Sequence, residues 1–341
     1  MNNSTPTVAV DVMGSDMGPE ELIIGVKKAL AEDKSNYEII IVGNESVITP
    51  MLLRHNLIRE SRIKVYHASE VIEMDEKPIQ AIKSKRDSSM MRAIEIVKLG
   101  TADAVLSCGN TGALMAGGTI KLRTMDGIER PALGTVIPGK TKNFVMIDVG
   151  ASPDPKPESL VDNAILGANY ATVALGVSNP RVGLLSNGTE DGKGNMLVQT
   201  AHRLFKSQEG VINYRGLLEG FNLFDGDFDV VVCDGFTGNL VLKFMEGVAG
   251  TLMHMIKKEL LADTRSKLGA LLAKPAFKRV AKTMDYTEVG GAPLLGVQGA
   301  VVKAHGSSDG HAIACAIGQC VKMIDGRVVE LISANLADIL P

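Results

Sequence analysis

Short apolar runs rich in β-branched residues alternate with helical patterns along most of the 341-residue chain. The strand-like runs are 7–12, 37–42, 63–66, 103–107, 132–137, 143–148, 181–186 and 229–233. The helical patterns are about 19–33, 45–56, 88–100, 110–122, 157–176, 195–208, 238–260, 309–324 and 327–339. This alternation predicts an α/β fold with a mainly parallel sheet covered by helices on both faces. Two strand-like runs lie close together within 129–148, so part of the sheet is expected to be antiparallel.

Composition excludes several classes of protein. Hydrophobic residues make up 45% of the chain, enough for a large core, and the formal net charge is −3. That charge and the absence of tryptophan argue against a nucleic-acid partner. The four cysteines lie apart in apolar runs without a CxxC spacing, which predicts buried, reduced thiols of a cytoplasmic protein rather than a zinc site. Neither a signal peptide nor an 18-residue apolar span is expected.

Polar, glycine-rich loops follow five of the apolar runs, at 11–16, 107–118, 186–195, 234–239 and 304–317. In an open α/β sheet, ligands bind in the crevice at the carboxyl ends of the strands. Thr111 and Gly112 would open a helix there, and its free backbone amides suit a phosphate-like anion. Each loop alone is also consistent with turn chemistry and helix capping. The five together favour an anion-binding site.

Known nucleotide and metal motifs are missing. The sequence has no GxGxxG, GxSxG or HExxH pattern. The segment 188–194 has the composition of a P-loop, but its glycine spacing is wrong and no Ser or Thr follows Lys193. The residues therefore predict an α/β enzyme that binds a phosphate-like anion without a nucleotide loop, and they do not identify a reaction.

Eight segments in the same order along the chain resemble those of the bacterial phosphate acyltransferase family, the acyl-acyl carrier protein:phosphate transacylases of phospholipid synthesis. They are VDVMGSDMGPE (10–20), SCGNTGALMAG (107–117), ERPALGTVIP (129–138), DVGAS (148–152), VGLLSNGTEDGKG (182–194), LLEG (217–220), VVVCDGFTGNLVLKFMEG (230–247) and GGAPLLGVQGAVVKAHGSSDGHAI (290–313). The chain departs from the family at Ser15, where a second glycine is usual, and in the SNGTED and LVDNAILGANYA segments.

The resemblance implies a three-layer α/β/α sandwich similar to isocitrate and isopropylmalate dehydrogenases and to phosphotransacetylases. It implies a single family domain over 7–325, with two lobes that share a cleft, and a homodimer. The Pro-rich stretch 151–159 is the expected crossing between the lobes.

In the family, inorganic phosphate attacks the thioester of an acyl group on acyl carrier protein, which gives acyl phosphate and the free carrier. Phosphate is itself the nucleophile, so no cofactor and no metal is expected. The enzyme has to orient phosphate and to donate hydrogen bonds to the developing oxyanion.

Roles for individual residues follow from the side chains of these loops. Lys193 and His305 are expected to stabilise or orient phosphate, and Asp234 to orient one of these two. Asn110 and Asn239 are candidate oxyanion donors. The other predicted substrate-binding residues come from the same loops: Thr111, Gly112, Asn187, Gly238, Ser307 and Ser308.

The segment 255–282 carries eight basic and two acidic residues, with leucines between the charges. It predicts a protruding helical hairpin that contacts an anionic membrane or the acidic carrier protein. A solvated hairpin that packs at the dimer interface is the alternative. The family's peripheral membrane association favours the membrane, and the downstream glycerol-3-phosphate acyltransferase is a further expected partner.

Three other functions stay open on the sequence. One is a short-chain phosphotransacetylase that uses acyl-coenzyme A. Another is a nicotinamide dehydrogenase of the same fold, and the third is a non-catalytic scaffold for lipid enzymes.

Overall fold

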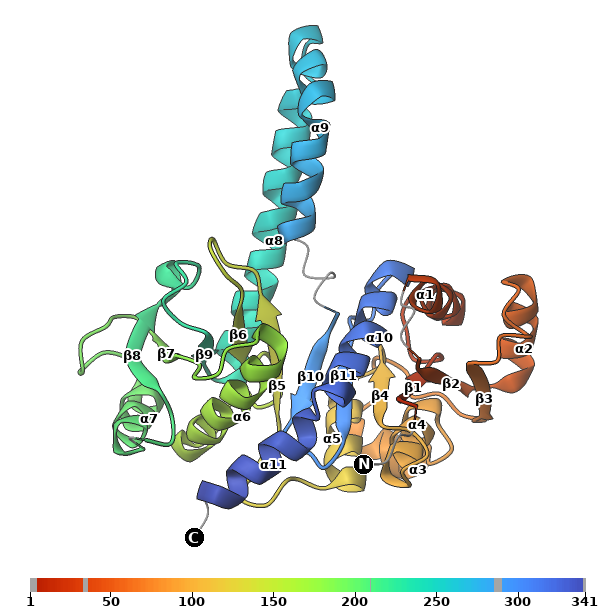
Figure 1. Cartoon of the computed structure of the whole chain (residues 1–341), viewed down its shortest axis with the longest axis horizontal. Helices are drawn as coiled ribbons and strands as arrows, with labels where there is room; N and C mark the ends of the chain where they lie inside the picture. The colour runs from red at the N-terminus through yellow and green to blue at the C-terminus, as the bar shows by residue number, and fades with distance from the viewer. Residues whose placement is uncertain (1–4, 33–35, 209, 285–289, 340–341) are drawn as a thin grey trace.

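The computed structural model describes residues 5–32, 36–208, 210–284 and 290–339. Its strands are β1 (Thr7–Asp11), β2 (Glu38–Gly43), β3 (Ile63–His67), β4 (Ala104–Ser107), β5 (Ala132–Ile137), β6 (Phe144–Ile147), β7 (Val182–Ser186), β8 (Tyr214–Glu219), β9 (Val230–Val232), β10 (Ala292–Leu295) and β11 (Ala300–Lys303). They form one 11-stranded sheet in the order β3-β2-β1-β4-β11-β10-β5-β6-β9-β7-β8 (Figure 1).

Most neighbouring strands are parallel, as predicted. The antiparallel pairs are β11–β10, β10–β5 and β5–β6, in the middle of the sheet. The β5–β6 pair confirms the antiparallel element expected within 129–148. Because of these pairs, β6, β9, β7 and β8 run opposite to β1–β4 and β11.

Helices cover both faces of the sheet. They are α1 (Pro19–Glu32), α2 (Glu45–Arg54), α3 (Pro78–Ser84), α4 (Ser89–Lys98), α5 (Thr111–Leu122), α6 (Pro157–Leu175), α7 (Met196–Ser207), α8 (Gly235–Leu260), α9 (Thr264–Met284), α10 (Gly310–Asp325) and α11 (Val328–Ile339), with a short 3-10 helix at Gly220–Asn222. One apolar core joins α1, α2, α6, α7, α10 and α11 to the sheet, and the other joins α3, α4, α5 and the start of α8. Val8 and Val10 of β1 belong to the first core and Ala9 to the second, so the strand is buried on both sides. The three-layer α/β/α prediction is confirmed.

The sheet has two halves that the chain joins twice. One half contains β1–β4 and β11, and the other contains β5–β9. The chain first passes between them at 123–131, from α5 to β5, and it returns through β10 and β11. The stretch 151–159, where the sequence suggested a crossing, instead connects β6 to α6 within the second half.

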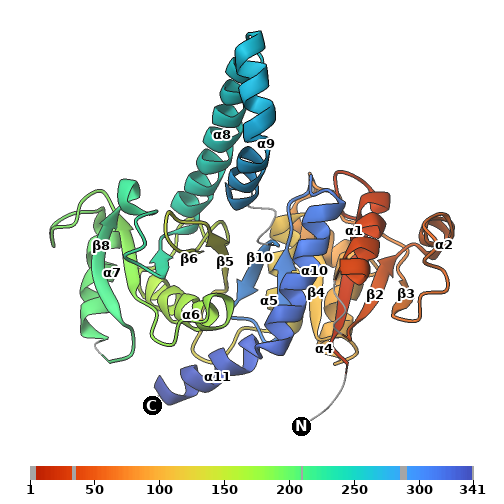
Figure 2. The same ribbon diagram turned by 45° about the horizontal axis from the view of Figure 1, so that its top comes forward.

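Helices α8 and α9 form a hairpin that projects from the body of the molecule (Figures 1 and 2). The first turn of α8 is anchored in the body, because a Cβ atom at Gly238 would collide with the carbonyl oxygen of Asp148. Beyond that turn most side chains of α8 and α9 are exposed or half-buried. Within the described ranges, no helix is long and apolar enough to cross a membrane.

Candidate active site

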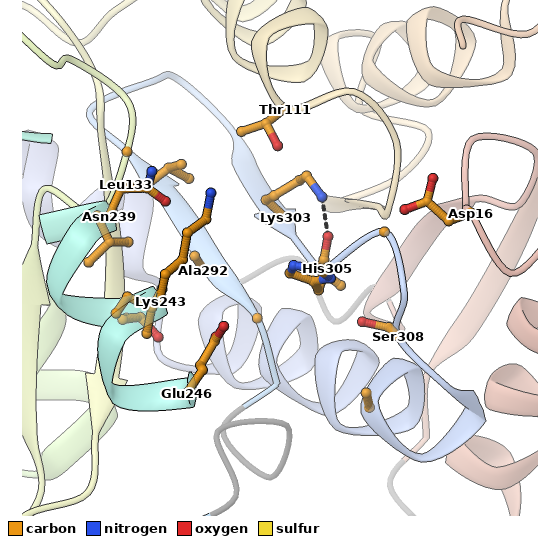
Figure 3. Close-up of a pocket in the computed structure, with 18 of the residues that line it drawn as sticks. Asp16, Thr111, Leu133, Asn239, Lys243, Glu246, Ala292, Lys303, His305 and Ser308 are labelled. Carbon is orange, nitrogen blue, oxygen red and sulfur yellow. Dashed lines mark hydrogen bonds between the residues drawn. The ribbon is translucent and has the colours of Figure 1, made fainter. Parts of the chain in front are cut away.

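A pocket of about 410 Å³ lies where the loops after β1, β3, β4, β6 and β11 meet the first turns of α8 (Figure 3). Its apolar lining includes Leu133, Val149, Leu242 and Ala292. Its polar lining comprises Asp16, Thr111, Thr135, Asn239, Lys243, Glu246, Lys303, His305 and Ser308. A concave site with apolar walls and a few convergent polar groups is the usual form of a small-molecule site. Four of the predicted residues meet here: Thr111, Asn239, His305 and Ser308.

The loop after β11 supplies His305 and Ser308 to the pocket. Ser308 is buried, and Ser307 is exposed but contacts the imidazole of His305. His305 Nδ1 lies 2.7 Å from Ser307 Oγ and 3.2 Å from Ser307 N. A backbone N–H can only donate, so Nδ1 is an acceptor and the neutral ring carries its proton on Nε2. His305 therefore offers the site an N–H donor.

Lys303, at the end of β11, is a pocket residue that the sequence analysis missed. Its Nζ donates to the carbonyl oxygen of Cys108 at 3.2 Å and to that of Ala304. Burial lowers the pKa of Lys303, and the nearby acidic groups of Cys108, Asp16 and Asp11 partly oppose this. The signal was a lysine that ends a buried apolar run directly before the 304–317 loop.

Helix α8 presents one face to the pocket. Asn239, Lys243 and Glu246 are spaced four and three residues apart, so they lie on the same side of the helix. Burial raises the pKa of Glu246, while the charges of His305 and Lys243 act in the opposite direction. Lys243 and Glu246 were also absent from the predicted site.

Asp234 is the N-cap of α8. Its Oδ1 accepts from the backbone N–H of Thr237 at 2.8 Å, and its Oδ2 accepts from the hydroxyl of Thr237 at 2.7 Å. It hydrogen-bonds neither His305 nor Lys193 in the described structure, contrary to the role expected for it. An Asp directly before a helix is a strong capping signal, and capping explains its place here.

Asn110 caps α5 in the same way. Its Oδ1 accepts from the backbone N–H of Ala113, and its Nδ2 donates to three backbone carbonyls of the 73–76 loop at 2.9–3.3 Å. The side-chain amide is thus engaged in holding that loop, which leaves Thr111 as the α5 residue that lines the pocket. Gly112 serves packing, since a Cβ atom there would collide with Pro78.

Lys193 and Asn187 lie on the loop between β7 and α7, outside the pocket lining. Lys193 is exposed, and Asn187 Oδ1 accepts from the backbone N–H of Gly194 at 2.9 Å. Strands β6, β9 and β7 are parallel, so this loop leaves the same edge of the sheet as Val149 and the start of α8. The loop lies farther from the middle of the sheet than β6 and β9 do.

The described residues contain no group of three or more His, Cys, Asp or Glu side chains that could hold a metal ion. The polar groups that this pocket offers are hydroxyls, an amide, an imidazole N–H, two ammonium groups and the carboxyl groups of Asp16 and Glu246.

Solved structures similar to the chain establish its fold. A phosphotransacetylase (EutD) from Staphylococcus aureus matches with a TM-score of 0.60 at 15% identity, over 98% of this chain and 94% of that one. A phosphotransacetylase from Streptococcus pyogenes matches with a TM-score of 0.62 at 14% identity, over 96% and 95%. A 4-hydroxythreonine-4-phosphate dehydrogenase from Klebsiella pneumoniae matches with a TM-score of 0.50 at 14% identity, over 93% and 99%. The fold is thus that of phosphotransacylases and related dehydrogenases, as expected.

Sequence relatives are much closer. The pattern of a family described as "Fatty acid synthesis protein" matches residues 6–331. A phosphate acyltransferase from Alkaliphilus oremlandii is 43% identical over 334 residues, 97% of this chain and 98% of that protein. A phosphate acyltransferase from Halothermothrix orenii is 44% identical over 329 residues, 96% of this chain and 98% of that protein. The chain belongs to the phosphate acyltransferase family.

Proposed function

We propose that the protein transfers a long-chain acyl group from acyl carrier protein to inorganic phosphate, the first step toward phosphatidic acid. The observation that carries this proposal is a pocket with apolar walls and convergent N–H and O–H donors, in a chain of this family. A phosphate oxygen attacks the thioester carbonyl carbon, and the C–S bond then breaks. The proton of hydrogen phosphate ends on the carrier thiol, so acyl phosphate and free carrier account for all atoms.

The donors of the pocket suit the two charges that this reaction has to stabilise. His305, through Nε2–H, and Asn239 are proposed as donors to the oxyanion that forms on the thioester carbonyl. The hydroxyls of Thr111 and Ser308 are proposed to hold phosphate oxygens. Lys193 is proposed to attract phosphate through its positive charge, from the loop between β7 and α7 outside the pocket lining.

A second copy of the chain is proposed to cover the start of α8. Phe236, Leu240 and Phe244 are spaced four residues apart, and each side chain is more than half exposed. They form an apolar ridge directly beside the pocket-lining face of Asn239 and Lys243. Contiguous exposed apolar surface of this kind marks an interaction site. A two-fold homodimer would bury this ridge in each of its two copies.

The outer part of the hairpin is proposed to rest on an anionic membrane surface, which would make the protein a cytoplasmic, peripherally associated enzyme. Leu268, Leu271 and Leu272 of α9 are 63–79% exposed, and basic residues lie close to them in the sequence. Burial of such leucines and attraction of basic residues to anionic lipid act together at an interface. At the membrane, the acyl phosphate would be released close to a downstream glycerol-3-phosphate acyltransferase.

The test is an assay of purified protein with palmitoyl-acyl carrier protein and phosphate, in a chelator and without nucleotide. We expect acyl phosphate, trapped as a hydroxamate, and free carrier in equal amounts. Faster turnover with acetyl-coenzyme A would instead identify a phosphotransacetylase. Reduction of a nicotinamide cofactor would identify a dehydrogenase, and no turnover at all would favour a scaffold.

A further inference from the structure

Lys303 has an unusual setting for a lysine side chain. It projects from the central strand β11 to the sheet face on which the pocket lies, and it is half-buried. Two of its three ammonium protons are accounted for by the carbonyl oxygens of Cys108 and Ala304. No carboxylate in the described ranges forms a salt bridge with it, although burying an unpaired ammonium is costly.

The carboxyl groups near Lys303 compensate its charge only in part, and none of the described ones forms a salt bridge with it. Asp11 is buried and accepts from the Ser107 hydroxyl at 2.7 Å and from the backbone N–H of Met13. Burial raises the pKa of Asp11, which favours its uncharged form. Asp16 lines the pocket next to the 305–308 loop, and its charge acts on Lys303 without an ion pair between them (Figure 3). A dianion in the pocket would supply the missing counter-charge.

We infer that Lys303 binds the phosphate nucleophile, through the ammonium proton that faces the pocket, together with the hydroxyl groups of Thr111 and Ser308. This inference rests on the proposed acyl transfer and identifies the cation that the reaction uses. Lys243 also lines the pocket, but its side chain is exposed, so water screens its charge. Lys303 is held in place by its two carbonyl partners before any ligand arrives, which lowers the entropy that binding costs.

Replacing Lys303 by Gln tests the assignment, because Gln is only one atom shorter, keeps a hydrogen-bond donor and removes the charge. We expect the KM for phosphate to rise about 10- to 100-fold, the range for losing a charged hydrogen bond, with a much smaller change in the KM for acyl carrier protein. Lys303→Arg keeps the charge and should lie closer to the wild type in its KM for phosphate. Lys121→Gln is the matched control, a half-buried lysine that pairs with Glu95 away from the pocket. It should leave both constants unchanged.

Binding is measured separately from turnover. Inorganic phosphate should raise the unfolding temperature of the wild type and of Lys121→Gln, but not that of Lys303→Gln. If Lys303→Gln does not fold, reductive methylation of the wild type tests the assignment instead. Phosphate should slow the labelling of Lys303 more than that of the other lysines. A phosphate KM unchanged in folded Lys303→Gln, or labelling indifferent to phosphate, overturns the inference. A wild type that binds phosphate but makes no acyl phosphate overturns the proposed function and leaves the phosphate site intact.

Discussion

Ser307 Oγ lies 2.7 Å from Nδ1 of His305, and the backbone N–H of Ser307 points to the same nitrogen at 3.2 Å. Two donors on one ring nitrogen fix both the tautomer and the orientation of the imidazole. His305, which lines the pocket, therefore has a single N–H to offer, on Nε2.

His305→Ala is expected to lower kcat about 10²- to 10³-fold, the usual effect of losing one preorganised donor to a transition-state charge. Ser307→Ala should have a smaller effect, because the backbone N–H of residue 307 still points to Nδ1. Steady-state kinetics with palmitoyl-acyl carrier protein, together with thermal unfolding to confirm folding, would measure both. Wild-type kcat in His305→Ala would remove this residue from the site.

Lys193→Ala is expected to lower kcat/KM, but less than His305→Ala does. Lys193 is exposed and lies outside the pocket lining, so solvent and salt screen its charge. The loss should therefore shrink as the salt concentration rises, which kinetics at two ionic strengths would show. A loss as large as that of His305→Ala, independent of salt, would mean that the 186–195 loop closes on the pocket during turnover.

The double variant Leu271→Glu, Leu272→Glu is expected to release the protein from anionic vesicles while sparing turnover of acyl carrier protein in solution. Leu272 is 79% exposed, and its burial in lipid would contribute about 25 cal/mol per Å² of surface removed from water. Vesicle flotation measures the change. Leu99→Glu, at a leucine 71% exposed on the body, is the control and should bind like the wild type.

Charge reversal at Lys274 and Lys278 separates the possible partners of the hairpin. Weaker vesicle binding, most marked at low salt, is expected if the basic residues face lipid. A higher KM for acyl carrier protein with unchanged flotation would instead identify a carrier-docking surface. Loss of the dimer in sedimentation, with neither of these changes, would identify a packing role.

Phe244→Glu is expected to convert the proposed dimer to monomers in sedimentation velocity. Phe244 is 69% exposed in the single chain, and a carboxylate there would be desolvated in any interface formed by the ridge of Phe236, Leu240 and Phe244. Phe221→Glu, at a phenylalanine 81% exposed outside the hairpin, should leave the oligomeric state unchanged. A dimer that survives Phe244→Glu places the interface elsewhere.

Asp162→Asn is expected to stabilise the protein at pH 7.5 but not at pH 4. Burial raises the pKa of Asp162 to about 6, and the charges of Glu129 and Glu158 add to the effect. Because the pKa of Asp162 is higher in the folded than in the unfolded protein, its protonated form stabilises the fold at pH values below the unfolded pKa. This stabilisation is lost as the pH rises through about 6. Unfolding temperatures of the variant and the wild type should therefore differ at pH 7.5 and converge at pH 4. Asp154→Asn, at an exposed carboxyl nearby, should show no such pattern.

The strands that could be predicted from sequence are those with a local signal. The 7–12 and 229–233 runs have β-branched residues on both faces, and β1 and β9 form there. Strand β8 was missed. Strands β10 and β11 were also missed, although β4, β6 and β9 are no longer than they are, and β10 contains Pro293. Their pairing depends on β4 and β5, far away in sequence, so no local pattern reveals it.

The site was predicted only in part for a related reason. A polar residue before a helix can cap it or can act on a ligand, and sequence does not separate the two. Asp234 and Asn110 turned out to be caps, whereas His305 and Ser308 line the pocket. Lys303 was not predicted because a lysine at the end of a strand is usually solvated. Its burial follows from the position of β11 between β4 and β10 inside the sheet, which the local sequence does not show.

The place of β10 and β11 has a consequence for how the protein is made. Val301 pairs with Val105 and Leu294 with Leu133, so strands near the end of the chain fill the gap between two halves that were synthesised long before. On the ribosome, the inner edges of β4 and β5 have no partner until residue 303 has emerged. Such edges are templates for wrong pairing, and contacts between distant residues slow folding. The nascent chain therefore depends on β10 and β11 to join its halves, and a ribosome that stops before residue 292 releases two half-sheets with open edges.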